Sequence, residues 1–374
     1  MTTDLSPDNP LALAEKLYQR SIWPDVKKVS RGERLTRPLV VELDTTSFCD
    51  LVCPECISKP LLNRARFTRD RLTGIAHELV DAGVRAVILI GGGEPLLHPA
   101  IADLLTILGS ARIAVGVTTN GTLIDRHIDV LAQYATWTRV SVDAGSAACF
   151  AKFRPSRSGE NLFSRVIENM RTLGARKKGK LGYSYLLIVR RDEGFGLTHN
   201  FNEVLRAALL AREIGCDYFE VKPSYDLNHY LIGQPEELRA LLRSQLSSLD
   251  TLVTGGFKVI KSSNLKVVLE DEPKEQEKTY HTCPVSELRT LITPAGLYVC
   301  PYHRGEEALR CGDLQNTSFG EAWNGSLRTS VMAKLDPVKD CKFHCIRHHS
   351  NQHLLRIRDL LDPPSLVEDY DLFI

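Results

Sequence analysis

The sequence predicts an α/β protein whose main part is a barrel or partial barrel of parallel strands. Short apolar runs rich in β-branched residues alternate with helical segments of amphipathic spacing, which is the pattern of parallel βαβ units. Six such units follow one another along the chain, and this favours a barrel over several small folds. The length of 374 residues, 43% of them hydrophobic, leaves room for a second, smaller domain.

Each strand of this barrel is expected where a short buried run ends in glycine or polar residues. The strands are expected at residues 38–49, 85–95, 113–121, 138–145, 181–191 and 216–225, and the main connecting helices at 67–83, 99–110, 163–179 and 201–215. Gly83 predicts the end of the first helix, because glycine readily takes the left-handed conformation that closes a helix. Active sites of such barrels lie at the carboxyl ends of the strands.

Composition and charge argue against several classes of partner. The net charge is +1, so no nucleic-acid partner is expected, and the basic stretch at residues 64–71 is interpreted as a solvated surface. No apolar run has the length of a signal peptide or of the roughly 18 residues that a membrane helix needs. The protein is therefore expected to be soluble and cytoplasmic, without a membrane partner.

The ten cysteines form two groups, with a few left between them. In a reducing compartment, closely spaced cysteines are metal ligands or catalytic groups more often than disulfides. Cys49, Cys53 and Cys56 follow the first expected strand. A structural zinc site would need a fourth ligand, and the next cysteine, Cys149, is far away in the sequence. A cubane bound by three thiolates instead leaves one iron open to a cofactor or substrate.

Together with the Gly-Gly-Glu-Pro sequence at residues 92–95, this CxxxCxxC motif resembles the radical S-adenosylmethionine (SAM) superfamily over roughly residues 39–230. The resemblance implies a partial (β/α)6 TIM-like barrel, with a 4Fe-4S cluster on the three cysteines and SAM on the open iron. It also implies reductive cleavage of SAM to a 5′-deoxyadenosyl radical that abstracts hydrogen from a substrate. A reductant such as flavodoxin or ferredoxin is the implied electron donor.

The resemblance further implies SAM contacts at the strand ends. The candidates are Gly92, Gly93, Glu94, Pro95, Asn120, Ser141, Asp143 and Arg154. Glu94 would accept hydrogen bonds from the methionine ammonium group, and Arg154 would pair with the methionine carboxylate. Three of these candidates have structural alternatives: Asp143 as a helix cap, Asn120 as a turn residue and Arg154 as a surface residue. No residue is assigned a catalytic role.

The second cysteine group comprises Cys283, Cys300, Cys341 and Cys345. Residues 288–303 predict a β-hairpin that ends near Cys300, and this layout resembles the SPASM/twitch extension of the superfamily. Four ligands would close an auxiliary 4Fe-4S cluster, and a structural zinc site is the alternative. Cys149 and Cys216 are expected to be inert and buried, whereas Cys311 stays open as a ligand or hydrogen-atom donor.

The expected domain organisation follows from these assignments. It comprises an N-terminal helical extension (1–38), the barrel (39–245), a bridging region (246–282) and an auxiliary cluster domain (283–374). Candidate substrate contacts, chosen by location alone, are Lys222, Tyr225, Asp226, His229 and Tyr230. The histidines at 348, 349 and 353 are expected to be solvated or to face the substrate, with a metal role as the alternative.

Two functions of different classes remain. The first is oxidation of a small molecule, such as a sugar, an aminocyclitol or an amino-acid-like compound, with the auxiliary cluster accepting the second electron. The alternative is a peptide maturase or epimerase. The first is favoured because the 38 residues before the barrel are too few for the peptide-binding domain that such maturases often carry. A non-enzymatic iron-sulfur electron carrier is the third class, and the SAM motifs argue against it.

Overall fold

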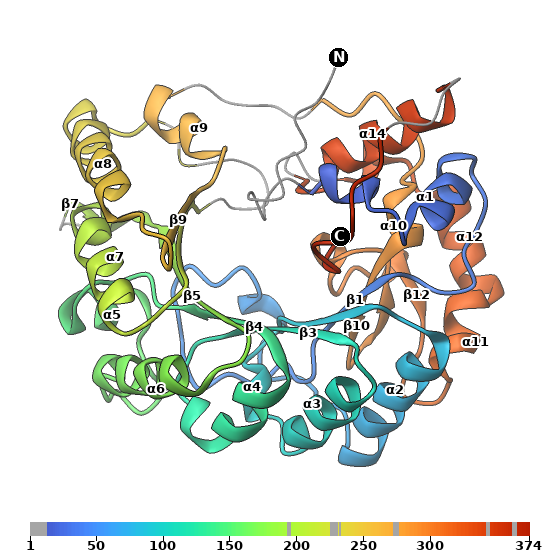
Figure 1. The fold of residues 1–374 in the computed structure, drawn as a ribbon, viewed down its shortest axis with the longest axis horizontal. Helices are drawn as coiled ribbons and strands as arrows, with labels where there is room; N and C mark the ends of the chain where they lie inside the picture. The colour runs from blue at the N-terminus through green and yellow to red at the C-terminus, as the bar shows by residue number, and fades with distance from the viewer. Residues whose placement is uncertain are drawn as a thin grey trace.

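The computed structural model describes residues 13–192, 196–224, 231, 233–271, 277–341, 345–360 and 365–374. A ten-stranded sheet curls into a partial barrel with helices on its outer face (Figure 1). All six expected strands are present and parallel, which confirms the predicted fold class. They are β1 (Val40–Leu43), β2 (Ala86–Leu89), β3 (Ala114–Thr119), β4 (Ala135–Ser141), β5 (Lys180–Leu187) and β8 (Tyr218–Pro223).

The helices that connect these strands pack on the outer face of the sheet (Figure 1). They are α2 (Arg69–Ala82), α3 (Ile101–Ser110), α4 (Ile128–Tyr134), α5 (Ala147–Phe153), α6 (Phe163–Arg176), α7 (Val204–Glu213) and α8 (Glu236–Ser248). Helix α2 begins with a cap by Thr68 and ends at Gly83, whose φ of 74° is the expected left-handed closure. None of the helices in the described residues is long and apolar enough to cross a membrane.

Side chains alternate between the two faces of the strands, and this places polar groups inside the barrel. On β1, Val41 and Leu43 belong to the core beneath the outer helices, whereas Glu42 belongs to the opposite face. Inside the barrel, Trp137 of β4 lies against Gly116 of β3. A Cβ atom on Gly116 would lie 2.2 Å from the indole ring, so the glycine is required by the packing of the tryptophan.

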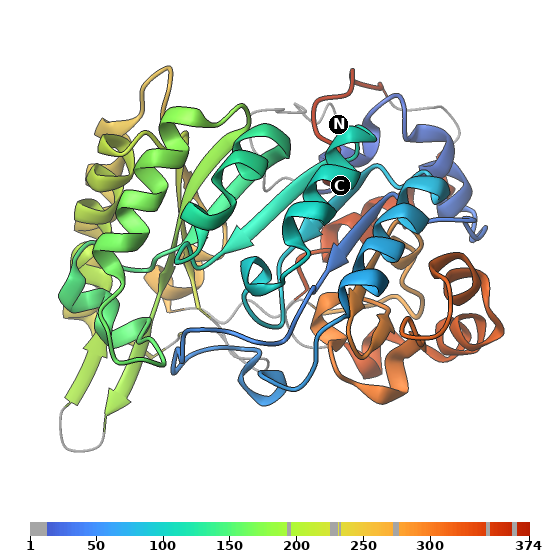
Figure 2. The same cartoon turned by 90° about the horizontal axis from the view of Figure 1, so that it is seen from below.

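A second core closes the end of the barrel where the strands begin. It joins helix α1 (Trp23–Ser30) and helix α14 (His348–Arg358) to the C-terminal residues (Figure 2). Phe373 packs edge-on against Trp137 with ring centroids 5.3 Å apart, and Ile374 is buried beside it. The last residues of the chain, Phe373 and Ile374, therefore fill the interior at this end, which leaves the carboxyl ends of the strands as the place for a site.

The C-terminal part continues the barrel sheet. Strand β10 (Arg289–Thr293) pairs in parallel with β1, and β11 (Gly296–Tyr298) and β12 (Arg310–Gly312) follow in antiparallel order. The hairpin itself is as expected, but its attachment to β1 was not predicted. Besides α14, the described residues of this part form the helices α10 (Val285–Leu288), α11 (Phe319–Asn324), α12 (Ser326–Lys334) and α13 (Pro337–Asp340). The expected domain boundaries stay predictions.

Two further features differ from expectation. The single strand expected at residues 181–191 is two strands, because the Asn200 side chain bonds the backbone of Ile188 and Leu186 and ends β5. The chain then forms a separate hairpin, with β6 (Val189–Asp192) paired to β7 (Gly196–His199). Beyond β8, the strand β9 (Lys258–Lys261) adds a further parallel neighbour, followed by helix α9 (Leu265–Glu270).

An ion pair between Asp44 and Arg304 fastens the C-terminal part to the barrel. Asp44 follows β1 and is buried, and its two carboxylate oxygens accept hydrogen bonds from Arg304 at 2.5 and 3.0 Å. Burial raises the pKa of Asp44, and Arg304 opposes this shift. The pair matters because loss of either partner would leave a charge buried without its counter-ion.

We expect Arg304→Met to lower the free energy of unfolding at pH 7 by about 3–5 kcal/mol, measured by urea denaturation. The loss should shrink as the pH falls, because protonation of Asp44 removes the unpaired buried charge. Arg165→Met is the control, since its ion pair with Asp125 is exposed and should contribute at most about 1 kcal/mol. Equal losses for both variants would contradict this role of the pair.

Candidate functional site

The first three candidate ligands lie on the loop between β1 and α2, at the carboxyl end of the barrel (Figure 2). Cys49, Cys53 and Cys56 are all half-buried and free of disulfides. Burial raises the pKa of the Cys49 thiol to about 12 and also raises that of Cys53. Thiols held in this state need a cation to become thiolates, and a bound iron-sulfur cluster would supply it.

Two side chains after β3 hold this cysteine loop. Asn120 donates from Nδ2 to Asp50 Oδ1 at 2.7 Å, and Thr122 donates to Asp50 Oδ2 at 2.6 Å. The same Nδ2 lies 4.0 Å from Cys49 Sγ. Gly121 has a φ of 85°, so the expected turn is also present. The Asn120 side chain thus contacts the cysteine loop, and its role as a direct SAM ligand stays a prediction.

The Gly-Gly-Glu-Pro segment packs directly against the cysteine loop. The Gly93 amide donates to Thr46 O at 3.2 Å, and the Glu94 amide donates to Phe48 O at 2.8 Å. A Cβ atom on Gly93 would lie 2.2 Å from that Phe48 oxygen, so only glycine fits. The packing of the protein itself therefore requires glycine at this position. Gly92 and Pro95 are both buried.

Glu94 is buried at 2% exposure, and its carboxylate joins the ends of β2 and β3. Oε1 accepts hydrogen bonds from Thr119 Oγ1 (2.7 Å) and the Leu96 amide (3.0 Å), and Oε2 accepts one from the Asn120 amide (2.7 Å). Burial raises the pKa of Glu94 to about 7, although these donors oppose the shift. Oε2 retains acceptor capacity, which a ligand ammonium group would fill.

Asp143 and Arg154 form an ion pair beside the cysteine loop. Asp143 Oδ2 accepts from Arg154 Nε at 2.8 Å, and its Oδ1 accepts from the Leu186 amide at 2.7 Å. Helix α5 is capped by Ser146 instead, so the capping role for Asp143 is wrong. Arg154 is not a surface residue: although burial opposes the shift, Asp143 and the thiols Cys53 and Cys56 raise the pKa of Arg154. Its guanidinium therefore lies next to the candidate cluster ligands.

Ser141 and Lys222 belong to the inner wall of the barrel. Ser141 is half-buried in β4, in register with Ser184 of β5. Lys222 binds Glu220 on its own strand at 3.1 Å, and Arg139 of β4 binds the same carboxylate at 3.3 Å. We had not singled out Arg139 or Glu220, although the alternation along β4 and β8 places both on the inner face. Residues 225–230, with the other four expected substrate contacts, lie outside the described residues.

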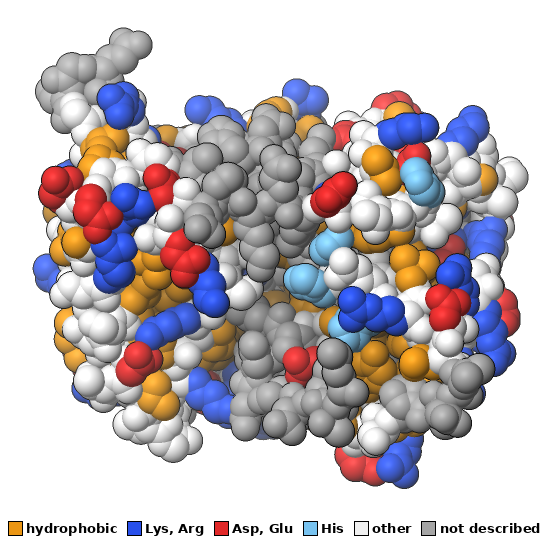
Figure 3. Space-filling model, turned by 90° about the horizontal axis from the view of Figure 1, so that it is seen from above, with side chains coloured by type: hydrophobic (Ala, Val, Ile, Leu, Met, Phe, Trp, Pro, Cys, Tyr) orange, Lys and Arg blue, Asp and Glu red, His pale blue; other side chains and the backbone are white. Residues whose placement is uncertain are grey.

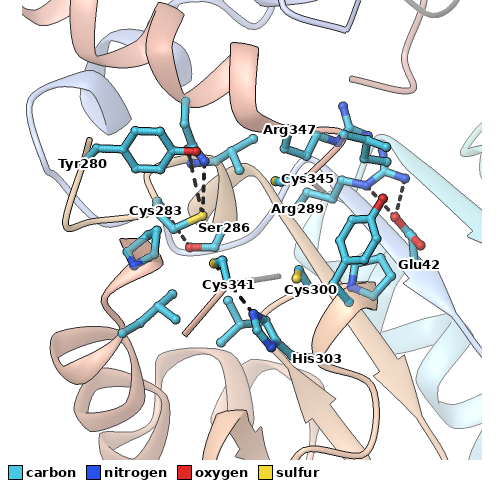
Figure 4. A pocket seen from close by; sticks show the side chains of 18 residues that line it. Glu42, Tyr280, Cys283, Ser286, Arg289, Cys300, His303, Cys341, Cys345 and Arg347 are labelled. Atoms are coloured by element: carbon cyan, nitrogen blue, oxygen red, sulfur yellow. Dashed lines mark hydrogen bonds and ion pairs between the residues drawn. The ribbon is translucent and has the colours of Figure 1, made fainter. Parts of the chain in front are cut away.

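The second cysteine group surrounds one cavity of about 50 Å³ (Figure 4). Cys283, Cys300, Cys341 and Cys345 all line it. This volume is several times the roughly 10–15 Å³ that one water molecule needs on the same measure. Among the described residues, no three cysteine, histidine or acidic side chains converge closely enough to hold a single metal ion. Four thiols around a cavity of this size suit the ligand set of a 4Fe-4S cluster, and the choice between iron-sulfur and zinc stays a prediction.

Buried polar groups point at these thiols. Asn351 Nδ2 lies 3.4 Å from Cys283 Sγ, and His303 Nε2 lies 3.8 Å from Cys341 Sγ. His303 is held in turn by Glu306, whose Oε2 is 2.8 Å from Nδ1. Burial, reinforced by neighbouring cysteines, raises the pKa of Cys283 to about 11 and that of Cys341 to about 12. No local sequence pattern identifies Asn351 or His303, because each contacts a cysteine that is distant in the sequence.

The remaining cysteines do not line this cavity. Cys311 is 2% exposed in β12, and Cys149 and Cys216 are buried as expected. A ligand role for Cys311 in the second set therefore receives no support from the described geometry.

Figure 3 shows histidine side chains close together on the face seen from above. His348 is nevertheless buried and bonds Tyr280 at 3.1 Å, and His353 bonds Tyr18 at 3.0 Å. Our expectation that these histidines are solvated or face the substrate is wrong for His348, because packing against Tyr280 removes it from solvent.

Residues 43–193 match the family described as the radical SAM superfamily. The chain is also similar to mycofactocin maturase MftC of Mycobacterium ulcerans (strain Agy99), with 22% identity over 302 residues, covering 78% of this chain and 76% of the relative. GTP 3′,8-cyclase of Synechocystis sp. (strain ATCC 27184 / PCC 6803 / Kazusa) is 30% identical over 146 residues, 38% of this chain and 42% of that protein. Residues 43–193 thus form a radical SAM domain, and enzymes of this superfamily use a 4Fe-4S cluster and SAM.

Solved structures share the fold. SuiB of Streptococcus suis, bound to its precursor peptide SuiA, matches with a TM-score of 0.59 and 18% identity, covering 87% of this chain and 75% of that one. The enzyme anSMEcpe, with bound AdoMet and the Cp18Cys peptide, matches with a TM-score of 0.57 and 14% identity, covering 86% and 99%. At these identities the likeness supports the partial barrel alone.

We expect Glu94→Gln to weaken SAM binding by about 1–3 kcal/mol, which is roughly five- to 150-fold in Kd, because the amide removes the charge that would pair with the ligand ammonium. Anaerobic calorimetry on the reconstituted protein measures this. Glu78→Gln is the control, since Glu78 pairs with Arg71 on the outer helix α2. An unchanged Kd for Glu94→Gln would mean that Glu94 only links the ends of β2 and β3 and does not bind SAM.

Proposed function

We propose that this protein is a radical SAM enzyme that modifies a peptide, with an auxiliary iron-sulfur cluster on Cys283, Cys300, Cys341 and Cys345. The similarity to mycofactocin maturase carries the proposal, because a 302-residue match is too long to be confined to the barrel. SuiB, which was solved with its precursor peptide SuiA, shares the fold of this chain. The comparisons thus favour our peptide alternative over the small-molecule oxidation that we first expected.

The first cysteine set and the residues around it would carry the radical chemistry. A 4Fe-4S cluster with SAM, bound at Cys49, Cys53 and Cys56, would supply the 5′-deoxyadenosyl radical that abstracts hydrogen from the peptide. Glu94 would hold the methionine ammonium group, and the guanidinium of Arg154 would keep a positive charge beside the cysteine loop. Asn120 and Asp50 keep this loop in place over the strand ends. A flavodoxin or ferredoxin would be the reductant.

The β6–β7 hairpin offers a docking place for an extended peptide. It projects from the barrel (Figure 2) and pairs with no other strand among the described residues. Arg190 of β6 ties it to the cysteine loop through Glu55, with Nη1 2.9 Å from Oε1, and lies over the Phe153 ring. Unpaired strand edges bind extended peptides by backbone hydrogen bonds. A peptide added to this hairpin would run beside Cys53 and Cys56.

The test uses the reconstituted full-length enzyme with SAM, dithionite and synthetic peptides encoded by short reading frames next to its gene. We expect one such peptide to raise 5′-deoxyadenosine formation at least tenfold above the peptide-free rate and to change in mass. The triple variant Cys49→Ala/Cys53→Ala/Cys56→Ala should abolish both signals. Cys216→Ala is the matched control, because that thiol is buried away from both cysteine sets.

One outcome would favour oxidation of a small molecule over modification of a peptide. If a sugar or aminocyclitol stimulates 5′-deoxyadenosine formation and is itself oxidised, while no peptide changes in mass, the peptide proposal is contradicted. Liquid chromatography with mass spectrometry reads both substrates in the same assay.

A further inference from the structure

Arg347 lies at the wall of the four-cysteine cavity in an unusual electrostatic setting. The residue is 8% exposed, and its Nε has no hydrogen-bond partner among the described residues. Its neighbour Arg289 is already engaged, because Nε and Nη2 bind Glu42 Oε1 at 2.8 and 2.5 Å and Nη1 donates to Ile374 O at 2.7 Å. Arg289 thus has its carboxylate partner, whereas Arg347 beside it makes no ion pair with an acidic side chain among the described residues.

Such an arrangement calls for an additional anion. A guanidinium that is buried without full pairing costs several kcal/mol, and a second cation beside it adds repulsion. Cys345 lies two positions before Arg347, and both line the same cavity with the other three cysteines. Four thiolates outweigh the positive charge of an iron-sulfur core, so a cluster there would be anionic. The excess positive charge and the cysteine set therefore complement each other.

Arg347 lies on the side of the cavity that faces the barrel interior. Figure 4 shows Arg347 and Arg289 on the side of the cavity next to Glu42, and Glu42 belongs to the inner face of β1. The cation therefore lies between the cysteine set and the barrel interior. A positive charge on this side stabilises an added electron on the cluster more than it stabilises the oxidised state, because reduction adds one negative charge.

We infer that Arg347 is the counter-charge of the auxiliary cluster and raises its midpoint potential, so that the cluster accepts an electron from the barrel side. Arg347 is thus a positioning and tuning residue that acts through the cluster and does not touch the substrate. The inference rests on the auxiliary cluster of the proposed function. Asn351, whose Nδ2 donates to Cys283 Sγ at 3.4 Å, acts in the same direction.

The experiment measures the potential of the auxiliary cluster by itself. The parent is the full-length chain with Cys49, Cys53 and Cys56 changed to alanine, reconstituted with iron and sulfide and titrated potentiometrically by electron paramagnetic resonance. Arg347→Met in this parent should make electron acceptance at least tenfold less favourable, a downward shift of 59 mV for one electron. Arg347→Lys keeps the charge and should retain most of the parent potential.

Arg328→Met is the matched control. Arg328 is also buried, at 2% exposure, and packs over the Trp323 ring beside Glu287. Its Nη1 likewise has no hydrogen-bond partner among the described residues. It does not line the four-cysteine cavity. Its replacement should leave the midpoint potential of the cluster unchanged, whatever it does to stability.

Each outcome of this experiment either supports or overturns the inference about Arg347. An unchanged potential in Arg347→Met overturns the inference but leaves the auxiliary cluster standing, whereas absence of any iron-sulfur signal in the parent overturns the cluster and the inference with it. If Arg347→Met fails to hold a cluster, Arg347→Gln and Arg347→Lys are compared. The inference is supported if Arg347→Lys keeps the cluster near the parent potential and Arg347→Gln does not. Equal behaviour of the two variants, including equal loss, overturns the role of charge.

Discussion

Three hydrogen bonds to the buried carboxylate of Glu94 fix the ends of β2 and β3, and the first cysteine loop depends on them. One of these donors is the amide of Asn120, whose side chain in turn holds Asp50 within the loop. The segment before Glu94 contributes as well, since Gly93 can approach Phe48 closely only without a side chain. The three thiols are thus positioned by the protein itself, through contacts that connect three successive strand ends.

The second cysteine set is related to the first by a continuous sheet. Strand β10 pairs with β1, and the cysteine loop follows β1 directly, so both sets are positioned from the same strand. The ion pairs of Glu42 with Arg289 and of Asp44 with Arg304 reinforce this junction from the inner face and the strand end. A rigid sheet fixes the separation of the two sets more firmly than a flexible linker would.

Local patterns in the sequence predicted the six barrel strands, because burial and alternation are local properties. They did not predict the end of β5 at Asn200, the junction of β10 with β1 or the short, half-exposed β9, since these depend on residues distant in the chain. The same distinction holds at the site. Cysteine spacing identified both sets, whereas the pairing of Asp143 with Arg154 and the buried position of Arg347 became visible only in three dimensions.

The central claim is that one sheet carries two separate 4Fe-4S sites. Iron and sulfide analysis with Mössbauer spectroscopy on the anaerobically reconstituted protein tests it most directly. The account predicts about eight irons per chain, and about four in each variant that lacks one complete cysteine set. Retention of all iron after Cys49, Cys53 and Cys56 are replaced, or zinc in place of iron at the second set, would contradict it.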